Sequence, residues 1–250
     1  AALWMILEST GRSGEFADLI ADHWSLAEEP TQEAEWQFQA GKWAAARYAH
    51  AEALGRLQRA LDLTSEGDIA RRFELLDVRE RIFERQGRRE VQADGLARLD
   101  ELAGILGDPG QQAEIALRTS TYKRITYDFP SAIAYAQQAL EKSRFAGNLA
   151  QQAEAYLAWG SGLAAQGEGT QARELFDQAR ELAQQGGFQQ TEADTLIRLA
   201  GLSHDPVKRK TYLERGLKIA QQIGDRRREA RYLLNIGISI AAQELFAEAK

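Results

Sequence analysis

A glycine recurs along this chain at nearly constant spacing, and this repeat limits the possible folds more than any other feature. The recurring residues, separated by 40, 40, 40 and 37 positions, are Gly67, Gly107, Gly147, Gly187 and Gly224. Four of them are followed by Asp or Asn. Glycine ends a helix because it enters the left-handed region without a Cβ penalty, and Asp or Asn caps the next helix by accepting from its free N–H groups. The pattern predicts a repeat of about forty residues with a helix boundary at each mark.

A second set of turns divides each repeat into two amphipathic stretches of about 15 to 18 residues, which is the length of ordinary helices. These inner turns lie at 86–87, 127–130 and 166–169. All four prolines fall at proposed helix starts, where a missing N–H costs little: Pro30, Pro109, Pro130 and Pro206. Runs of β-branched and aromatic residues at period two are absent from the sequence. We therefore predict an all-α fold of antiparallel helix pairs with almost no strand.

The composition is that of a folded chain without disulfides. Of the 250 residues, 44% are hydrophobic and 27% are charged, and none is cysteine. No run of about 18 uncharged apolar residues occurs, and residues 1–8 lack the basic leader of a signal peptide. The absence of cysteine suits a reducing compartment, so we expect a cytoplasmic location. The formal charge of −6 argues mildly against a nucleic-acid partner.

One repeat carries the residues of a known motif. The stretch 156–160 contains Tyr156, Trp159 and Gly160, and it is followed by Gly167, Ala172, Phe176 and the pair Ala179–Arg180. This sequence resembles the tetratricopeptide signature, in which small residues allow two helices to cross closely. The resemblance implies a right-handed α-solenoid. Partial copies lie in the other repeats, although the second has Gln92 and Leu99 where the family prefers alanine.

The segment 16–63 resembles the region that follows the nucleotide-binding module in large bacterial signalling ATPases, whose C-terminal arm is a tetratricopeptide-like array. The resemblance implies a regulatory arm, and the chain is expected to be a fragment of a larger signalling protein. No G-x-x-x-x-G-K-[ST] phosphate-binding sequence occurs here. We expect a single superhelix over 1–250 with no second domain. Its approximate repeats are 15–66, 67–106, 107–146, 147–186, 187–223 and a truncated 224–250.

No pattern of residues indicates catalysis. The three histidines, His23, His50 and His204, lie on different repeats without the i, i+4 pairing of a helical zinc site. Ser203, His204 and Asp205 are adjacent, and adjacent residues do not form a catalytic triad, so we interpret this stretch as a capped turn. Carboxylate pairs such as Glu28–Glu29 and Glu80 with Glu84 are interpreted as solvated helix faces. We expect no enzyme activity, cofactor or metal.

An arginine-rich segment admits two interpretations. Between positions 71 and 89 there are seven arginines and four acidic residues. The favoured interpretation is a helix face with pairs at spacing four, such as Asp77 to Arg81 and Glu84 to Arg88, each worth a few tenths of a kcal/mol. The alternative is a patch for an acidic partner or a phosphate, which keeps nucleic-acid binding through this second repeat as a hypothesis.

The inner, concave wall of such an array is formed by the first helix of each repeat. The family pattern implies that a partner would contact Asp77, Arg81, Arg85, Leu117, Thr121, Arg124, Leu157, Ser161, Ala164, Ile197, Gly201, Arg231, Leu234 and Ile238. We expect the early part of this wall to be charged and the later part apolar. Such a wall suits an amphipathic helix or an extended peptide. Because the Lys and Asn residues that clamp a free C-terminal carboxylate are replaced by Leu, Thr or Ser, we expect no such clamp.

The leading hypothesis is therefore a protein-interaction scaffold and regulatory module that binds a partner protein or peptide in its groove. The first alternative is a receptor for a small signalling peptide, and the second is the nucleic-acid binding described above. An enzyme with a site assembled from separate repeats is a further alternative, and it would need a pocket of converging polar groups with shifted pKa values. The net charge makes nucleic-acid binding the weakest of these alternatives. The oligomeric state is left open.

Overall fold

The computed structural model describes residues 13–248, and for residues 242–248 it describes the helical backbone only. The interpretation of residues 1–8 therefore lies outside the described residues. The described part is all helical, which confirms the predicted class, and contains no strand. Its elements are η1 (Ser13–Phe16), α2 (Ala17–Leu26), α3 (Pro30–Ala46), α4 (His50–Leu63), α5 (Ile69–Gln86), α6 (Arg89–Leu106), α7 (Pro109–Ile125), α8 (Phe129–Phe145), α9 (Leu149–Ala165), α10 (Gly169–Gly186), α11 (Gln189–Leu202), α12 (Pro206–Gln222) and α13 (Arg226–Glu248).

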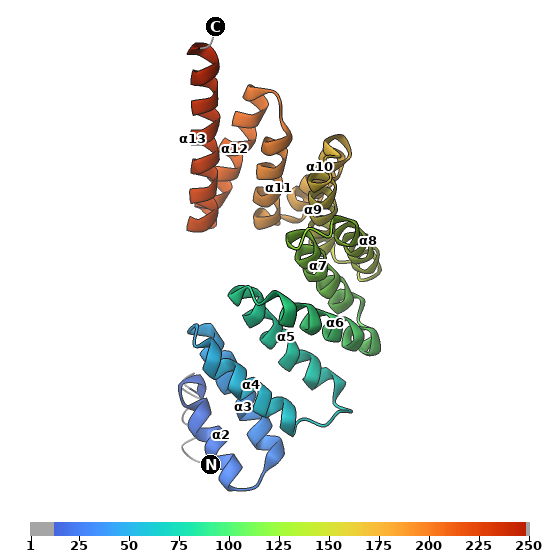
Figure 1. Ribbon diagram of the computed structural model, residues 1–250, viewed down its shortest axis with the longest axis vertical. Coiled ribbons are helices and arrows are strands. Elements are labelled where there is room, and N and C mark those ends of the chain that lie inside the picture. The colour runs from blue at the N-terminus through green and yellow to red at the C-terminus, as the bar shows by residue number, and fades with distance from the viewer. Residues whose placement is uncertain (1–12, 249–250) are drawn as a thin grey trace. The chain divides into compact units, whose positions relative to one another are not determined.

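Contacts between residues divide the chain into two compact units, Ala1–Gly107 and Asp108–Lys250. The N-terminal unit holds η1 to α6 and the C-terminal unit holds α7 to α13, coloured blue to green and green to red (Figure 1). The division falls at the predicted boundary between the second and third repeats. Each unit is described by itself below.

In the C-terminal unit every helix packs against the next one along the chain, and α9 also contacts both α7 and α11. The helices α7, α9 and α11, which are the first helices of their repeats, therefore lie side by side, as Figure 1 shows for α7 and α9. Within the repeat, α9 and α10 pack closely because Gly160 has no side chain. A Cβ on Gly160 would lie 2.7 Å from the Cε1 atom of Phe176 on α10. Ala172, Ala179 and Phe176 are fully buried. This repeat uses its motif residues as the tetratricopeptide resemblance implies.

The helix ends follow the predicted capping. The side chains of Asp68, Asp108, Asn148 and Asp225 each accept a hydrogen bond from a backbone N–H of the following helix. The glycines that precede three of them, at 107, 147 and 224, have φ between +66° and +71°. Gly67 differs, because α4 ends earlier at Leu63 and Gly67 lies in a turn without positive φ. The prediction that Gly67 closes a helix was therefore wrong.

Two junctions near the C-terminal end differ from the simple pattern. Phe188 gives α11 no side-chain cap, and its N–H instead donates to the carbonyl oxygen of Ala183 at 2.8 Å. From the sequence alone, the interval of 37 residues between Gly187 and Gly224 suggests a shorter turn at 202–205. The structure places the shortening in the helix, because α11 has 14 residues and α9 has 17. The turn itself is capped as expected, with Asp205 accepting from the N–H of Val207 at 2.8 Å.

All four prolines lie in the first two positions of a helix, as predicted. One expected solvated carboxylate is instead buried. Glu80 is 1% exposed and accepts a hydrogen bond at 2.9 Å from the side-chain amide of Gln92, which is 3% exposed. The interpretation of Glu80 as solvated was wrong because it faces the α5–α6 contact, where Gln92 replaces the usual alanine. Glu84, one turn away, is exposed.

The arginines of the segment 71–89 are largely engaged inside the N-terminal unit. The expected pair of Asp77 and Arg81 is present at 3.0 Å, whereas Glu84 and Arg88 are not paired and Arg88 lies over the ring of Phe83. The other contacts are those of Arg71 with Glu35 and Glu74, Arg72 with the carbonyl oxygens of Leu61 and Thr64, Arg79 with the Phe83 ring, and Arg89 with Gln92. This pattern favours the structural interpretation of the segment.

Candidate functional site: a charged pocket on the first helices of the C-terminal unit

The face shared by α7, α9, α11 and α13 is built from positions that recur with the repeat. On a helix, residues three, four and seven positions apart lie on one face. Leu117, Thr121 and Arg124 therefore share a face of α7, and Leu157 and Ser161 occupy the equivalent positions of α9. Since the first helices lie side by side, these faces form one continuous surface.

This surface is hollowed into a pocket of about 320 Å³, which we call the charged pocket. Its lining combines apolar side chains, hydroxyl groups, three arginines and two carboxylates. The lining residues are Leu117, Ser120, Thr121, Arg124, Glu154, Leu157, Ala158, Ser161, Asp194, Arg198 and Arg231.

The structure brings together six of the residues that the sequence singled out, namely Leu117, Thr121, Arg124, Leu157, Ser161 and Arg231. The others lie elsewhere. Ala164 and Ile197 pack against buried clusters, and Leu234 and Ile238 are exposed on α13. Gly201 and Ile238 line a separate, shallow pocket of about 180 Å³. Asp77, Arg81 and Arg85 belong to the N-terminal unit.

Sequence reasoning missed five lining residues: Ser120, Glu154, Ala158, Asp194 and Arg198. The repeat itself carried the signal, because Glu154 and Asp194 are forty residues apart and one turn before the singled-out positions Leu157 and Ile197. Arg198 and Ala158 are likewise forty residues apart. The predicted wall therefore omitted the residues one helical turn before the positions that were singled out. The expectation that its later part is apolar was wrong, since these acids and Arg198 charge it.

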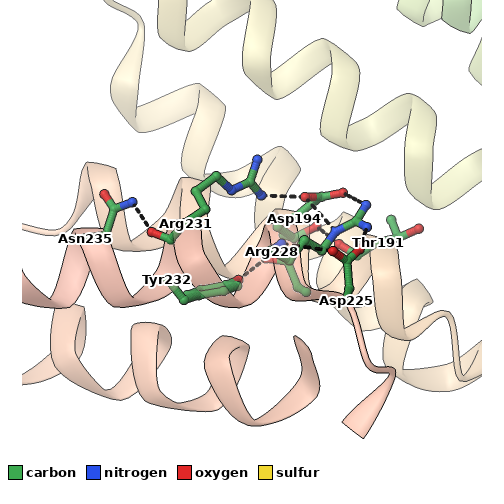
Figure 2. A network of polar contacts seen from close by, with 9 residues as sticks. Thr191, Asp194, Asp225, Arg228, Arg231, Tyr232 and Asn235 are labelled. Atoms are coloured by element: carbon green, nitrogen blue, oxygen red, sulfur yellow. Dashed lines mark hydrogen bonds and ion pairs between the residues drawn. The ribbon is translucent and has the colours of Figure 1, made fainter. Parts of the chain in front are cut away.

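One side of the charged pocket is fixed by an ion-pair network between α11 and α13 (Figure 2). The guanidinium of Arg228 donates to the Oδ2 atom of Asp194 at 2.7 Å, and that of Arg231 donates to its Oδ1 atom at 2.6 Å. Arg228 also pairs with Asp225. The hydrogen bond with Asp194 is the main cause that raises the pKa of Arg228 above its ordinary value. Figure 2 shows Arg228 and Arg231 reaching the same carboxylate, so Asp194 is fully engaged.

The opposite situation holds for two other arginines of the charged pocket. The guanidinium groups of Arg124 and Arg198 make no hydrogen bond and no ion pair with any residue that the structure describes. Arg198 keeps contact with water, yet the pocket walls partly desolvate it. This burial, together with the positive charges of Arg124 and Arg231, lowers the pKa of Arg198. The negative charge of Asp194 opposes this shift, and the pocket holds two guanidinium groups that form no ion pair with a described residue.

Glu154 is an unpaired group of the opposite sign. Its carboxylate forms no ion pair within residues 14–241 and remains accessible to water. Partial burial raises the pKa of Glu154, and the negative charges of Glu114 and Asp194 raise it further. A charge that is partly desolvated without a partner lowers stability, and groups of this kind are concentrated at functional sites.

The charged pocket is lined by hydroxyl groups as well as by charged side chains. Two of its three hydroxyl groups are engaged with main chain, since Ser120 donates to the carbonyl oxygen of Ala132 at 2.7 Å and Ser161 to that of Leu157 at 2.7 Å. No histidine or cysteine lines it. Within the part of the chain that the structure describes, no three His, Cys, Asp or Glu side chains gather where a metal ion could be held. No helix in this part is long and apolar enough to cross a membrane.

No protein-family model matches the chain, and no curated protein matches it. Solved structures do. Aspartyl phosphate phosphatase F from Bacillus subtilis is 12% identical with a TM-score of 0.76, and the match covers 88% of this chain and 59% of that one. A Rap protein complexed with competence and sporulation factor is 16% identical with a TM-score of 0.68, and the match covers 80% of this chain and 57% of that one.

A third similar structure is a signal transduction ATPase with numerous domains from Pyrococcus horikoshii, which has a tetratricopeptide repeat sensor. It is 13% identical with a TM-score of 0.67, and the match covers 87% of this chain and 37% of that one. At these identities the likeness establishes the fold alone. The chain is a tetratricopeptide-like α-solenoid, and it spans about three fifths of the length of the first two structures.

Proposed function

We propose that this chain is a non-enzymatic binding module that holds a polypeptide segment on the face formed by α7, α9, α11 and α13. The observation that carries the proposal is the charged pocket of about 320 Å³, with Arg124, Arg198 and Glu154 lacking partners among the described residues. Folding leaves these charges without an ion-pair partner among the described residues, so they are available to pair with groups of a ligand. Leu117 and Leu157 add apolar contact surface beside the charges. A peptide offers both kinds of group at close spacing.

The similar structures support the same proposal through what they contain. One is a Rap protein in complex with a factor, and another is an ATPase with a tetratricopeptide repeat sensor. By analogy we place this chain as a sensing or regulatory arm of a larger bacterial signalling protein, and its lack of cysteine suits the cytoplasm. The phosphatase activity for which the Bacillus subtilis protein is named belongs to that protein.

Selection from a displayed library of random 12-residue peptides tests the proposal without knowledge of the natural partner. The wild-type chain should enrich a family of related peptides. Leu157→Glu introduces a negative charge at the pocket wall and should abolish the enrichment. Gln178→Glu introduces the same charge on an exposed position of α10, a second helix, and should leave it intact. If wild type enriches nothing, or if Leu157→Glu selects the same peptides, the proposed binding face is wrong.

A free signalling peptide is the second candidate ligand, and the volume of the charged pocket suits it equally. A pocket of this size accommodates only a few side chains, so a short peptide would fill it as well as a segment of a large protein would. The two candidates differ in whether the ligand chain continues on both sides of the bound residues. Calorimetric titration of a selected peptide and of the same peptide extended by ten residues at each end separates them, because a site for a free peptide binds the extended form at least tenfold more weakly.

A further inference from the structure

The charged pocket presents two guanidinium groups that form no ion pair with a described residue, Arg124 on α7 and Arg198 on α11. Resting on the proposed function, we propose that these two arginines hold one acidic side chain, Asp or Glu, from within the bound peptide. Arginine suits this role because its planar group binds a carboxylate through two parallel hydrogen bonds. Two arginines on helices that are not adjacent in the chain can approach one carboxylate from two sides.

The charge balance of the charged pocket favours a single negative charge in the ligand. Its lining carries the guanidiniums of Arg124, Arg198 and Arg231 and the carboxylates of Glu154 and Asp194, which leaves a formal charge of +1. A carboxylate carries one negative charge and completes this balance. A phosphate group carries close to two at neutral pH. It would leave an excess of negative charge beside Glu154, so the lining matches an acidic side chain better.

The third arginine does not compete for the ligand. Arg231 is bound to Asp194 at 2.6 Å, and Arg228 shares the same carboxylate at 2.7 Å. The carboxylate of Asp194 therefore holds the Arg231 side chain. The positive charge of Arg231 still contributes to the potential at Arg198. This division of roles leaves Arg124 and Arg198 as the direct contacts.

The remaining lining residues set what surrounds the acidic group. Leu117 and Leu157 supply apolar surface for the methylene groups of the same side chain, and Thr121 adds a hydroxyl that no described residue engages. Glu154 repels a second carboxylate and can accept a backbone N–H of the peptide. The charged pocket should therefore select one acidic residue flanked by neutral residues and reject runs of acidic residues.

The test measures binding of one selected 12-residue peptide and of its Glu→Gln or Asp→Asn form by fluorescence anisotropy. Wild type should bind the neutral form at least tenfold more weakly, because a charge-assisted hydrogen bond is lost. Arg124→Met and Arg198→Met should each weaken binding of the acidic peptide by about 10- to 100-fold. Each variant should bind the acidic and neutral peptides with similar affinity, since the two losses share one interaction.

Lys210→Met is the matched control, because it removes one positive charge from an exposed position of α12 in the same unit. It should bind like wild type. Selected peptides without a common acidic position, or arginine variants that keep the preference for the acidic form, would overturn the inference and leave the proposed function standing. Failure of wild type to select any peptide would remove both.

Two further arms separate other anions. Amidation of the peptide C-terminus should leave affinity unchanged, and a loss of more than tenfold would assign the arginines to a chain terminus instead. Oligouridylate should compete poorly at 150 mM salt. If oligouridylate displaces the peptide at a concentration below that of the peptide, and if this competition is lost in Arg124→Met and Arg198→Met, the arginines form an RNA site. That result would contradict the inference.

Discussion

At the scale of single residues, the charged pocket keeps charges that the fold alone does not favour. Arg198 is crowded by the pocket walls and by two other arginines, and Glu154 is crowded by the walls and by two other carboxylates. Residues that serve binding are commonly retained at some loss of stability. Removing either charge should therefore raise stability and reduce binding. Substitution of a residue with a purely structural role would lower both stability and binding.

Arg198→Met should raise the midpoint of thermal unfolding at pH 7 by about 1–2 °C, a small effect because water screens a group that remains accessible. Circular dichroism melting curves of the variant, of wild type and of Lys210→Met provide the measurement. The control Lys210→Met should have the same midpoint of thermal unfolding as wild type. A lower midpoint for Arg198→Met would mean that the guanidinium stabilises the fold through a contact, and it would weaken the case for a binding role.

Glu154→Gln should also stabilise the chain at neutral pH, and its effect should depend on pH. The folded chain raises the pKa of Glu154, so folding favours the protonated form and the ionised form lowers stability. The stabilisation by Gln should be full above the folded-state pKa, decline as the pH falls through it, and vanish below about 4.3, the unfolded value. Urea unfolding at pH 7 and pH 4 checks this, and a gain that is equal at both pH values would contradict it.

At the scale of helices, close crossings depend on glycines that face aromatic rings. A Cβ on Gly160 of α9 would lie 2.7 Å from the Phe176 ring and 3.1 Å from the carbonyl oxygen of Ala172. A Cβ on Gly216 of α12 would lie 2.1 Å from the ring of Tyr232, which is fully buried. These two positions set how near α10 lies to α9 and α13 to α12.

Gly160→Ala should lower the free energy of unfolding by about 1–3 kcal/mol, because the added methyl group forces the Phe176 ring or the backbone of α10 to move. Gly55→Ala is the matched control, since Gly55 lies in the middle of α4 with open space around it. There alanine should raise stability by about 0.5–1 kcal/mol through its better helix propensity. Chemical denaturation of both variants gives the comparison, and equal effects would contradict the close-crossing argument.

Tyr232 should make the packing of α13 on α11 sensitive to high pH. Its hydroxyl is buried and donates to the carbonyl oxygen of Ala193, and burial raises the pKa of Tyr232 well above its ordinary value. A raised pKa means that folding favours the neutral phenol, so its contribution to stability is present below about pH 10 and is lost as the pH rises further. Melting at pH 8 and pH 11 should show a smaller decrease for Tyr232→Phe than for wild type.

The sequence predicted the helices well because caps and prolines act locally. Asp108, Asn148 and Asp225 cap the helices that follow them, and every proline lies at a helix start. Gly67 was misinterpreted because a glycine in a turn and a glycine at a helix end look alike in sequence. Glu80 was misinterpreted because its burial depends on Gln92 across the α5–α6 contact.

At the scale of the whole molecule, the two compact units use arginine differently. In the N-terminal unit the arginines of the segment 71–89 mostly pair with carboxylates, carbonyl oxygens and the Phe83 ring. In the C-terminal unit Arg124 and Arg198 are left without a partner among the described residues. Counting arginines in the sequence pointed to the first group, because which arginines stay unpaired depends on contacts between helices far apart in the chain.

The charged pocket was predicted in part for the same reason. The face of the first helices follows from helix periodicity, and six of the eleven lining residues were singled out. The width of the wall and the pairing of Asp194 with two arginines of α13 depend on how closely α11 and α13 approach. Local sequence does not encode that distance.

The central claim is that a peptide binds on the face of α7, α9, α11 and α13. The chain contains no cysteine, so one introduced cysteine can carry a photo-crosslinker at a chosen position. A benzophenone attached to Thr121→Cys, in the charged pocket, should crosslink to a selected peptide, and an excess of unlabelled peptide should prevent the reaction. The same probe on Gln178→Cys, exposed on α10, should not crosslink. Crosslinking from position 178 and not from position 121 would contradict the claim.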